Sequence, residues 1–318
     1  MPRVPGLRSP HARVGRLVFF GRMLDKIRLD ACGALPPEYR ANLGEGTPMR
    51  LDGRCCRFLG VPYEEIRGRT LGGGCDEEVL SWAEARGPER SDEECAVWNG
   101  YITKIGWRDE RTEALRGRVA EWGLPEGSAQ TIFELLDVDE GRPAGATRPW
   151  EAHPLSVLVL MGVSGSGKTT VGAALARELG WEFLEADEFH PPANVAKMSA
   201  GSALDDSDRE PWLEAVRAAL EARSRRGARA VAACSALKAA YRRVLAPDPA
   251  DTRFVHLRGD LALLGGRLRA RTGHFMKEGL LPSQFEALEE PLDALVVDAA
   301  QAQDVIVHRI RTVFGLPR

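Results

Sequence analysis

The sequence lacks long apolar runs and an excess of charge of either sign. No stretch of its 318 residues approaches the roughly 18 apolar residues that cross a bilayer as a helix. Its 43 basic and 46 acidic residues leave a formal net charge of −3, without the basic excess that nucleic-acid-binding proteins use to hold phosphates. We therefore expect neither a membrane protein nor a nucleic-acid-binding protein.

Cysteine is also scarce. The six cysteines form no CxxC pair and no Cys/His cluster at zinc-binding spacing, which is typical of reduced thiols in a cytoplasmic protein. Cys55 and Cys56 are adjacent, and a redox role is a minor alternative to two ordinary thiols. Cys234 is followed by Ser235 but by no suitably placed base, so we expect a buried strand cysteine rather than a nucleophile.

The chain divides into two halves of different pattern. Over residues 1–140 apolar residues recur at helical spacing, as from Phe20 to Ile27 and from Leu115 to Trp122. We expect these stripes to be buried and this half to be a mostly helical domain. Residues 141–154 are rich in glycine, proline and charge without periodicity, which predicts a linker.

Residues 155–318 predict a second domain with alternating strands and helices. The predicted strands are LSVLVLM, WEFLEAD, ARAVAACSAL, RFVHLRGD and DALVVDA, and helical segments separate them. This order predicts an α/β fold, with a parallel sheet covered by helices on both faces.

The first of these strands leads directly into GVSGSGKT at residues 162–169, a complete match to GxxxxGK[ST]. Backbone N–H groups of such a loop surround the phosphates of a nucleotide, the lysine neutralises charge, and the threonine hydroxyl can hold Mg²⁺. We therefore expect Lys168 to be catalytic and Thr169 to be a metal ligand. The predicted nucleotide-binding residues of the loop are Gly162, Val163, Ser164, Gly165, Ser166, Gly167, Lys168, Thr169 and Thr170.

A phosphate loop indicates a nucleotide, so the acceptor must be sought at the ends of the other strands, which line the ligand crevice of a parallel sheet. Asp187 follows the second strand and is a candidate base for an acceptor hydroxyl. A helix cap or a water-mediated Mg²⁺ contact is the alternative. His190 precedes two prolines, and a turn is as good an interpretation as a substrate contact.

Three cations are candidates for binding an anionic acceptor. Arg209 lies at the start of a helix that we expect Asp208 to cap, where it either clamps a carboxylate or forms a structural pair with an aspartate. Lys238 and Arg242 are four residues apart, so we expect them to share one helix face near the crevice. A solvated surface is the alternative for this pair.

The motifs of residues 155–318 resemble those of one family. They are MGVSGSGKTTVG, DEFHPPANVAKMSAG, LDDSDREPWL, ACSALKAAYR, GHFM and SQFEALE, in the order and at about the spacing seen in gluconokinases, which are P-loop kinases. The resemblance implies transfer of phosphate from ATP to the terminal hydroxyl of D-gluconate, giving 6-phosphogluconate. It also implies a homodimer in many members.

The same resemblance implies a mobile lid over the ATP. Its residues are Arg267, Arg271, Gly273, His274 and Phe275. By this resemblance Arg271 is catalytic, Arg267 binds the nucleotide and His274 contacts the substrate. The sequence departs from the family pattern at Ser202, Ala203 and Lys277, which puts the lid in question more than the chemistry.

The N-terminal half resembles a small bacterial family known only as a domain of unknown function, through segments such as RSPHARVGRLVFFGRMLDKIR and GGGCDEEVLSWA. That resemblance implies no activity. Two alternatives to a gluconokinase remain at this point. One is a kinase for another small hydroxy acid such as shikimate, and the other is a nucleotide-dependent sensor that acts on a partner through the N-terminal module.

Overall fold

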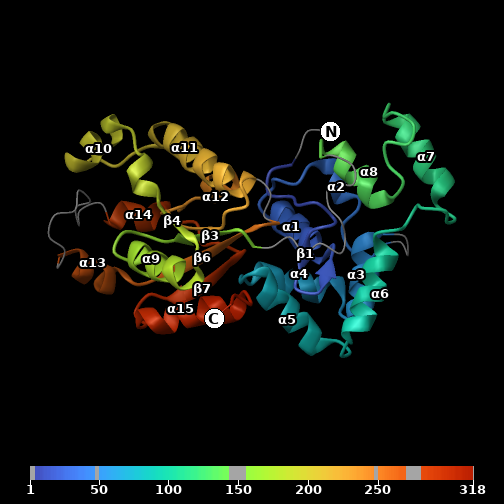
Figure 1. Ribbon diagram of the computed structural model, residues 1–318, viewed down its shortest axis with the longest axis horizontal. Coiled ribbons are helices and arrows are strands. Elements are labelled where there is room, and N and C mark those ends of the chain that lie inside the picture. The colour runs from blue at the N-terminus through green and yellow to red at the C-terminus, as the bar shows by residue number, and fades with distance from the viewer. Residues whose placement is uncertain (1–3, 47–49, 143–154, 247–249, 270–280, 318) are drawn as a thin grey trace. The chain divides into compact units, whose positions relative to one another are not determined.

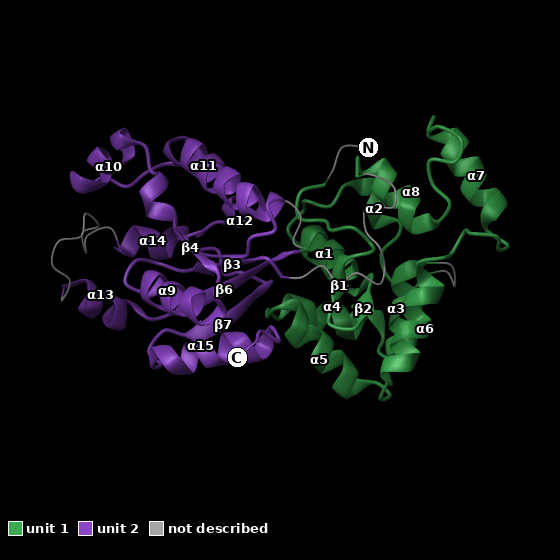
Figure 2. Ribbon diagram, viewed as in Figure 1, with its two compact units in different colours: residues 1–154, 248–250 green, residues 155–247, 251–318 purple. Residues whose placement is uncertain are grey.

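The computed structural model describes residues 4–46, 50–142, 155–246, 250–269 and 281–317. The chain forms two compact units, coloured separately in Figure 2. Unit 1 comprises residues 1–154 with 248–250, and unit 2 comprises residues 155–247 with 251–318. Within the described ranges, no helix combines the length and the apolar character that crossing a membrane requires.

Unit 1 is mostly helical (Figure 1). A hairpin of two-residue strands precedes its first helix, and such short strands leave no alternating pattern by which the sequence could have revealed them. Its elements are β1 (Arg13–Val14), β2 (Leu17–Val18), α1 (Phe20–Ala31), α2 (Pro37–Arg40), α3 (Leu51–Leu59), α4 (Tyr63–Leu71), α5 (Asp76–Arg86), α6 (Asp92–Ile102), α7 (Thr112–Glu121) and α8 (Ile132–Asp139).

Helix α1 lies at the centre of unit 1. The stripe from Phe20 to Ile27 is buried as predicted, and it packs against α4 and α5 in one apolar core. The stripe from Leu115 to Trp122 is only partly confirmed. Leu115 and Val119 are buried, but Trp122, the C-cap residue of α7, is 39% exposed.

Unit 1 also buries several charged side chains in pairs. Arg8 lies 2.6 Å from carboxylate oxygens of both Asp25 and Asp76, and Lys26 of α1 pairs with Asp52 of α3. Since a charge stripped of water is costly unless it is paired, these contacts fix the N-terminal segment and α1 against their neighbours.

A second buried group joins the start of unit 1 to its last helix. Arg22 of α1 forms an ion pair with Glu140, which also pairs with Arg142. Ser9 donates a hydrogen bond of 2.9 Å to Asp137 in α8. Arg142 is thereby bonded within unit 1, while the rest of the predicted linker, residues 143–154, lies outside the described residues.

Unit 2 is built on a five-stranded parallel sheet with strand order β4-β5-β3-β6-β7. The predicted α/β fold is thus confirmed. Figure 1 shows α9 and α15 on one side of this sheet and α11 and α12 on the other. The elements are β3 (Val157–Met161), α9 (Lys168–Leu179), β4 (Glu182–Glu185), the 3₁₀ helix η1 (Ala186–Phe189), α10 (Pro192–Ser199), α11 (Asp206–Arg225), β5 (Ala230–Ala233), α12 (Ala239–Leu245), β6 (Thr252–Arg258), α13 (Leu261–Arg269), α14 (Leu281–Ala287), β7 (Ala294–Asp298) and α15 (Gln303–Val313).

Burial explains the near-continuous apolar sequence of the central strand. All five residues of β3 are buried, because the sheet is covered on both faces. The start of α11 differs from the prediction: Asp205, not Asp208, is the N-cap, and Asp208 completes a capping box as the third residue of the helix. Arg209 therefore lies in the first turn of α11 rather than directly after its cap.

Asp137 gives unit 1 a testable pH dependence. Burial raises the pKa of its carboxyl to about 6, so between about pH 4 and pH 6 the folded state binds more protons than the unfolded state. The free energy of unfolding must then fall as pH rises through this window, by on the order of 2 kcal/mol.

Asp137→Asn removes this titration, while the amide oxygen can still accept the hydrogen bond from Ser9. We expect the variant to lack this part of the fall in stability in urea denaturation of the full chain at pH 4.5 and pH 7. Parallel pH dependences in the wild type and the variant would contradict the assignment.

Candidate active site

The candidate active site lies at the carboxyl ends of the central strands of unit 2. From β3 the chain passes to β4 and β5 on one side of β3, and then crosses to β6 and β7 on the other. A crevice forms at such a switch point, where successive connections leave a parallel sheet in opposite directions. The loops after β3, β4 and β5 therefore converge here.

The phosphate loop packs too tightly for side chains at two of its glycines. A Cβ atom on Gly162 would lie 2.8 Å from the carbonyl oxygen of Leu257, and one on Gly165 would lie 3.0 Å from that of Leu264. Both glycines also have positive φ, of 136° and 83°, which disfavours other residues. Gln284 of α14 accepts a hydrogen bond of 2.7 Å from the backbone N–H of Ser164 and holds the far side of the loop.

Lys168 and Thr169 begin helix α9, directly after the loop. The ammonium of Lys168 donates hydrogen bonds of 3.0 and 3.1 Å to the carbonyl oxygens of Gly162 and Val163. The ammonium of Lys168 therefore lies along the loop that we expect to bind the phosphates. Thr169 and Thr170 are exposed at the first turn of the helix, where the helix dipole favours negative charge.

Glu185 is a site residue that the sequence prediction missed. It ends β4, and its carboxylate accepts a hydrogen bond of 2.7 Å from the hydroxyl of Thr169. Burial raises the pKa of this carboxyl, while the Thr169 hydroxyl opposes the rise by stabilising the ionised form. Its position in the sequence could have indicated it, because Glu185 lies two residues before Asp187 at the end of the same strand. Of these two carboxylates, only Asp187 was predicted to have a role.

Asp187 and His190 both follow β4. Asp187 lies in η1, and His190 comes directly after η1. The Asp187 side chain is half-buried, close enough to Glu185 and His190 to influence both of their pKa values. His190 stacks on Trp212, with ring centroids 4.4 Å apart and planes 11° apart, and partial burial lowers its pKa. A neutral imidazole thus lies beside the carboxylate that was predicted to be the base.

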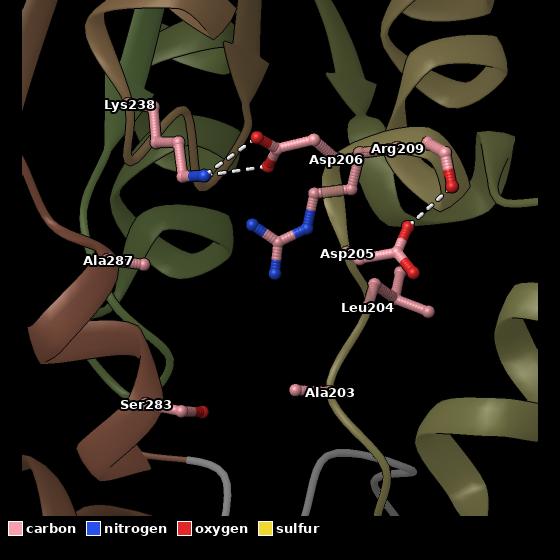
Figure 3. A pocket seen from close by; sticks show the side chains of 9 residues that line it. Ala203, Leu204, Asp205, Asp206, Arg209, Lys238, Ser283 and Ala287 are labelled. Carbon is pink, nitrogen blue, oxygen red and sulfur yellow. Dashed lines mark hydrogen bonds and ion pairs between the residues drawn. The ribbon is translucent and has the colours of Figure 1, made fainter.

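A cavity of about 480 Å³ is lined by the start of α11 and the residues before it, by Lys238 directly before α12, and by α14. Asp187 and His190 do not line it, but Arg209 does, and Arg209 is close enough to His190 to influence its pKa. Figure 3 shows the guanidinium of Arg209 pointing into its centre, between Lys238 and Asp205. Arg209 contacts Tyr241 in two ways: it donates a long hydrogen bond of 3.4 Å to the Tyr241 hydroxyl, and its guanidinium lies over the Tyr241 ring. No carboxylate pairs with it among the residues that the structure describes.

The other two predicted cations are placed differently from the prediction. Lys238 is the N-cap of α12, with extended backbone, so it does not share a helix face with Arg242. Its ammonium lines the cavity but is paired with both carboxylate oxygens of Asp206, at 2.7 and 2.9 Å. Arg242 is buried, and its guanidinium donates to the carbonyl oxygens of Ala236 and Leu237. It supports the loop after β5 and does not line the cavity.

The lid predicted from the resemblance is described only at its start. Arg271 and His274 lie outside the described residues, as do Gly273, Phe275 and Lys277. Arg267 lies in α13, where it donates a hydrogen bond of 2.9 Å to the carbonyl oxygen of Ala299 after β7. Cys234, in contrast, is a buried thiol whose pKa burial raises to about 12, which is unsuited to a nucleophile.

The fold and the site together define a P-loop kinase that acts on a small molecule. A complete phosphate loop follows the central strand, and a separate cavity of small-molecule size is lined by the start of α11, by Lys238 after β5 and by α14. A family model described as "AAA domain" matches residues 157–294, and one described as "Domain of unknown function (DUF5069)" matches residues 4–142.

Comparison with known proteins identifies the family within this class. The chain is 47% identical over 156 residues to a gluconokinase of Gluconobacter oxydans (strain 621H), covering 48% of this chain and 88% of that protein. It is 43% identical over 159 residues to the thermoresistant gluconokinase of Escherichia coli (strain K12), covering 49% of this chain and 91% of that one. The chain belongs to the gluconokinase family.

One solved structure is similar to about half of this chain. It is a gluconokinase from Sinorhizobium meliloti 1021, which is 42% identical and aligns with a TM-score of 0.46, covering 51% of this chain and 92% of that chain.

Proposed function

We propose that the chain is a gluconokinase, which transfers the terminal phosphoryl group of ATP to D-gluconate and forms 6-phospho-D-gluconate in unit 2. The observation that carries the proposal is the pairing of a complete phosphate loop with a cavity into which one arginine points. The phosphate loop supplies the donor site. Gluconate has a carboxylate at one end and a primary hydroxyl at the other, and Arg209 and Asp187 offer complementary groups for these two ends.

The residues at the start of α9 fit a nucleotide with Mg²⁺. Thr169 and Glu185 place a hydroxyl and a carboxylate within hydrogen-bond distance of each other, and oxygen ligands of this kind are what Mg²⁺ prefers. A bound Mg²⁺ neutralises charge on the phosphate oxygens. The backbone N–H groups from Gly162 to Thr170 surround the phosphates, and Lys168 adds a point charge once its ammonium leaves the carbonyl groups of the loop.

Catalysis then consists mostly of positioning and charge stabilisation. Asp187 accepts the proton of the terminal hydroxyl, whose oxygen forms the new bond to the γ-phosphorus while the bond to the bridging oxygen of ADP breaks. His190, whose pKa is lowered by partial burial, limits where the acceptor end of the sugar acid can lie. Arg271 and His274 complete the proposal as lid residues, and Arg267 as a nucleotide-side residue.

Arg209 is the centre of the proposed carboxylate site. Of the three predicted cations, Lys238 and Arg242 contribute less directly than Arg209. Asp206 already neutralises Lys238 in the cavity, and Arg242 already bonds two carbonyl groups. Lys238 therefore contributes most if Asp206 gives it up when the substrate carboxylate binds. Arg242 acts indirectly, by fixing the loop from Cys234 to Lys238.

The proposal extends to the whole chain: a cytoplasmic enzyme with a helical domain at 1–140, a linker at 141–154 and a kinase domain at 155–318, which acts as a homodimer. The alternative acceptor, shikimate, is also a hydroxylated carboxylate. The alternative role as a nucleotide sensor predicts ATP hydrolysis that does not depend on any acceptor. Both differ from the proposal in the dependence of turnover on gluconate.

Asp187→Asn tests the assignment of the base. We expect kcat for gluconate phosphorylation to fall by about 10²–10⁴, because an amide cannot accept the proton, while KM for ATP stays within about twofold. Glu188→Gln, one residue further along η1 and exposed, is the matched control and should retain near-wild-type kcat. An unchanged kcat with a raised KM for ATP would assign Asp187 to the nucleotide side instead.

Arg209→Leu tests the assignment of the carboxylate site. We expect kcat/KM for gluconate to fall by about 10–100-fold, because a charge-assisted hydrogen bond is lost, with little change for uncharged glucose. Arg225→Leu, at the exposed end of the same helix, is the control. The assignment is wrong if the preference for gluconate over glucose is the same in both variants when they are measured in one coupled assay.

A further inference from the structure

A second cavity lies wholly within unit 1, away from the kinase chemistry. It has a volume of about 580 Å³, which is within the usual range for small-molecule sites. Leu115, Val119 and Leu124 give it an apolar lining, while Trp107, Arg108 and Arg116 also line it. Nothing in the proposed phosphoryl transfer uses any of these residues.

The turn that carries Trp107 and Arg108 is built to be rigid. Asp109 accepts hydrogen bonds of 2.8 Å from the backbone N–H groups of Gly106 and Arg111. Thr112 donates a hydrogen bond of 3.0 Å to the carbonyl oxygen of Gly106 and thereby closes the turn against α7. The two side chains are thus presented on a fixed scaffold, as a binding site requires.

Trp107 and Arg108 each have a feature that structural stability alone does not favour. Trp107 remains 46% exposed although it is large and apolar. Arg108 has a φ of 52°, in the left-handed region that side chains other than glycine rarely adopt and that is enriched at ligand-binding sites. Glycine would adopt this backbone conformation without strain.

The charges at the cavity are available to an anion. The Arg108 guanidinium lies over the Trp107 ring, 5.2 Å from its centroid, and no carboxylate pairs with it in the part of the chain that the structure describes. Arg116 pairs with Glu113 one turn away, with both side chains well exposed, and such a pair is weak enough to exchange. Against these two arginines the lining carries one acid, Glu126.

We infer that this cavity binds a nucleoside monophosphate. An exposed tryptophan stacks well with the flat face of a base, and two arginines in the lining suit a phosphate, which guanidinium groups bind in a bidentate manner. The cation over the Trp107 ring moves with little loss when the base replaces it, because such a contact is weak at an exposed position. The amide of Gln130, also in the lining, is available to polar atoms of the base or ribose.

The test uses the full chain with Lys168→Ala, which disables the phosphate loop of unit 2, and isothermal titration calorimetry with AMP, GMP and UMP. Adenosine and inorganic phosphate are titrated separately. We expect at least one nucleotide to bind with a Kd below about 1 mM, and both fragments to bind at least tenfold more weakly, because the base and phosphate subsites act together.

Four further variants in the same background locate the site. Trp107→Ala and Arg108→Gly should each weaken nucleotide binding at least tenfold. Arg108→Gly keeps the left-handed backbone of the turn without strain, because glycine adopts positive φ readily. Trp122→Ala and Arg118→Ala are the controls, since both residues are exposed on or next to α7 and neither lines the cavity, and they should leave Kd unchanged.

The inference is overturned if none of the three nucleotides binds below 1 mM. It is also overturned if binding persists in both Trp107→Ala and Arg108→Gly, which would place the nucleotide elsewhere, or if inorganic phosphate alone binds as tightly as the nucleotides. None of these outcomes bears on gluconate phosphorylation, which is measured without the Lys168→Ala change.

Discussion

The site of unit 2 depends on how closely the phosphate loop packs against its neighbours. The backbone of Gly162 and Gly165 runs against the carbonyl groups of Leu257 and Leu264, with no space for a Cβ atom at either glycine. The N–H of Gly162 also donates a hydrogen bond of 3.2 Å to the carbonyl oxygen of Ser235. This bond ties the phosphate loop after β3 to the loop after β5, which carries Lys238 to the cavity.

The acceptor side is shaped by which of its charges are already neutralised. Lys238 and Asp206 cancel each other, and Arg242 is used to hold the loop that carries Ala236, whose φ of 45° is unusual for a residue other than glycine. Arg209 is the arginine that points into the cavity (Figure 3). In the proposed function, Arg209 receives the carboxylate of the acceptor and Asp187 its hydroxyl, which suits a chain with these groups at opposite ends.

The sequence predicted the features that depend on local pattern. A buried central strand followed by a glycine-rich loop is visible without tertiary information, and so are the alternating strands and helices. The errors concern contacts between distant segments. Lys238 and Arg242 were expected on one helix face because they are four residues apart, but the helix starts one residue after Lys238. The bond between Glu185 and Thr169 joins residues 16 positions apart, and it depends on the pairing order of the strands, which residue spacing alone does not specify.

In unit 1, too, local patterns could be predicted and contacts between distant segments could not. The stripe along α1 follows from helical periodicity, whereas the buried pairs such as Arg8 with Asp25 could not be predicted, because charged residues are ordinarily exposed. Trp122 is the C-cap residue of α7, and helix ends are the least certain part of any prediction from pattern.

The central claim is that unit 2 phosphorylates gluconate, and product formation tests it most directly. The purified full chain would be incubated with ATP, Mg²⁺ and D-gluconate, and 6-phosphogluconate and ADP would be quantified by mass spectrometry. The account predicts one 6-phosphogluconate for each ADP, with ADP formation almost absent when gluconate is omitted. ADP release at the same rate with and without gluconate, or faster phosphorylation of shikimate than of gluconate, would contradict it.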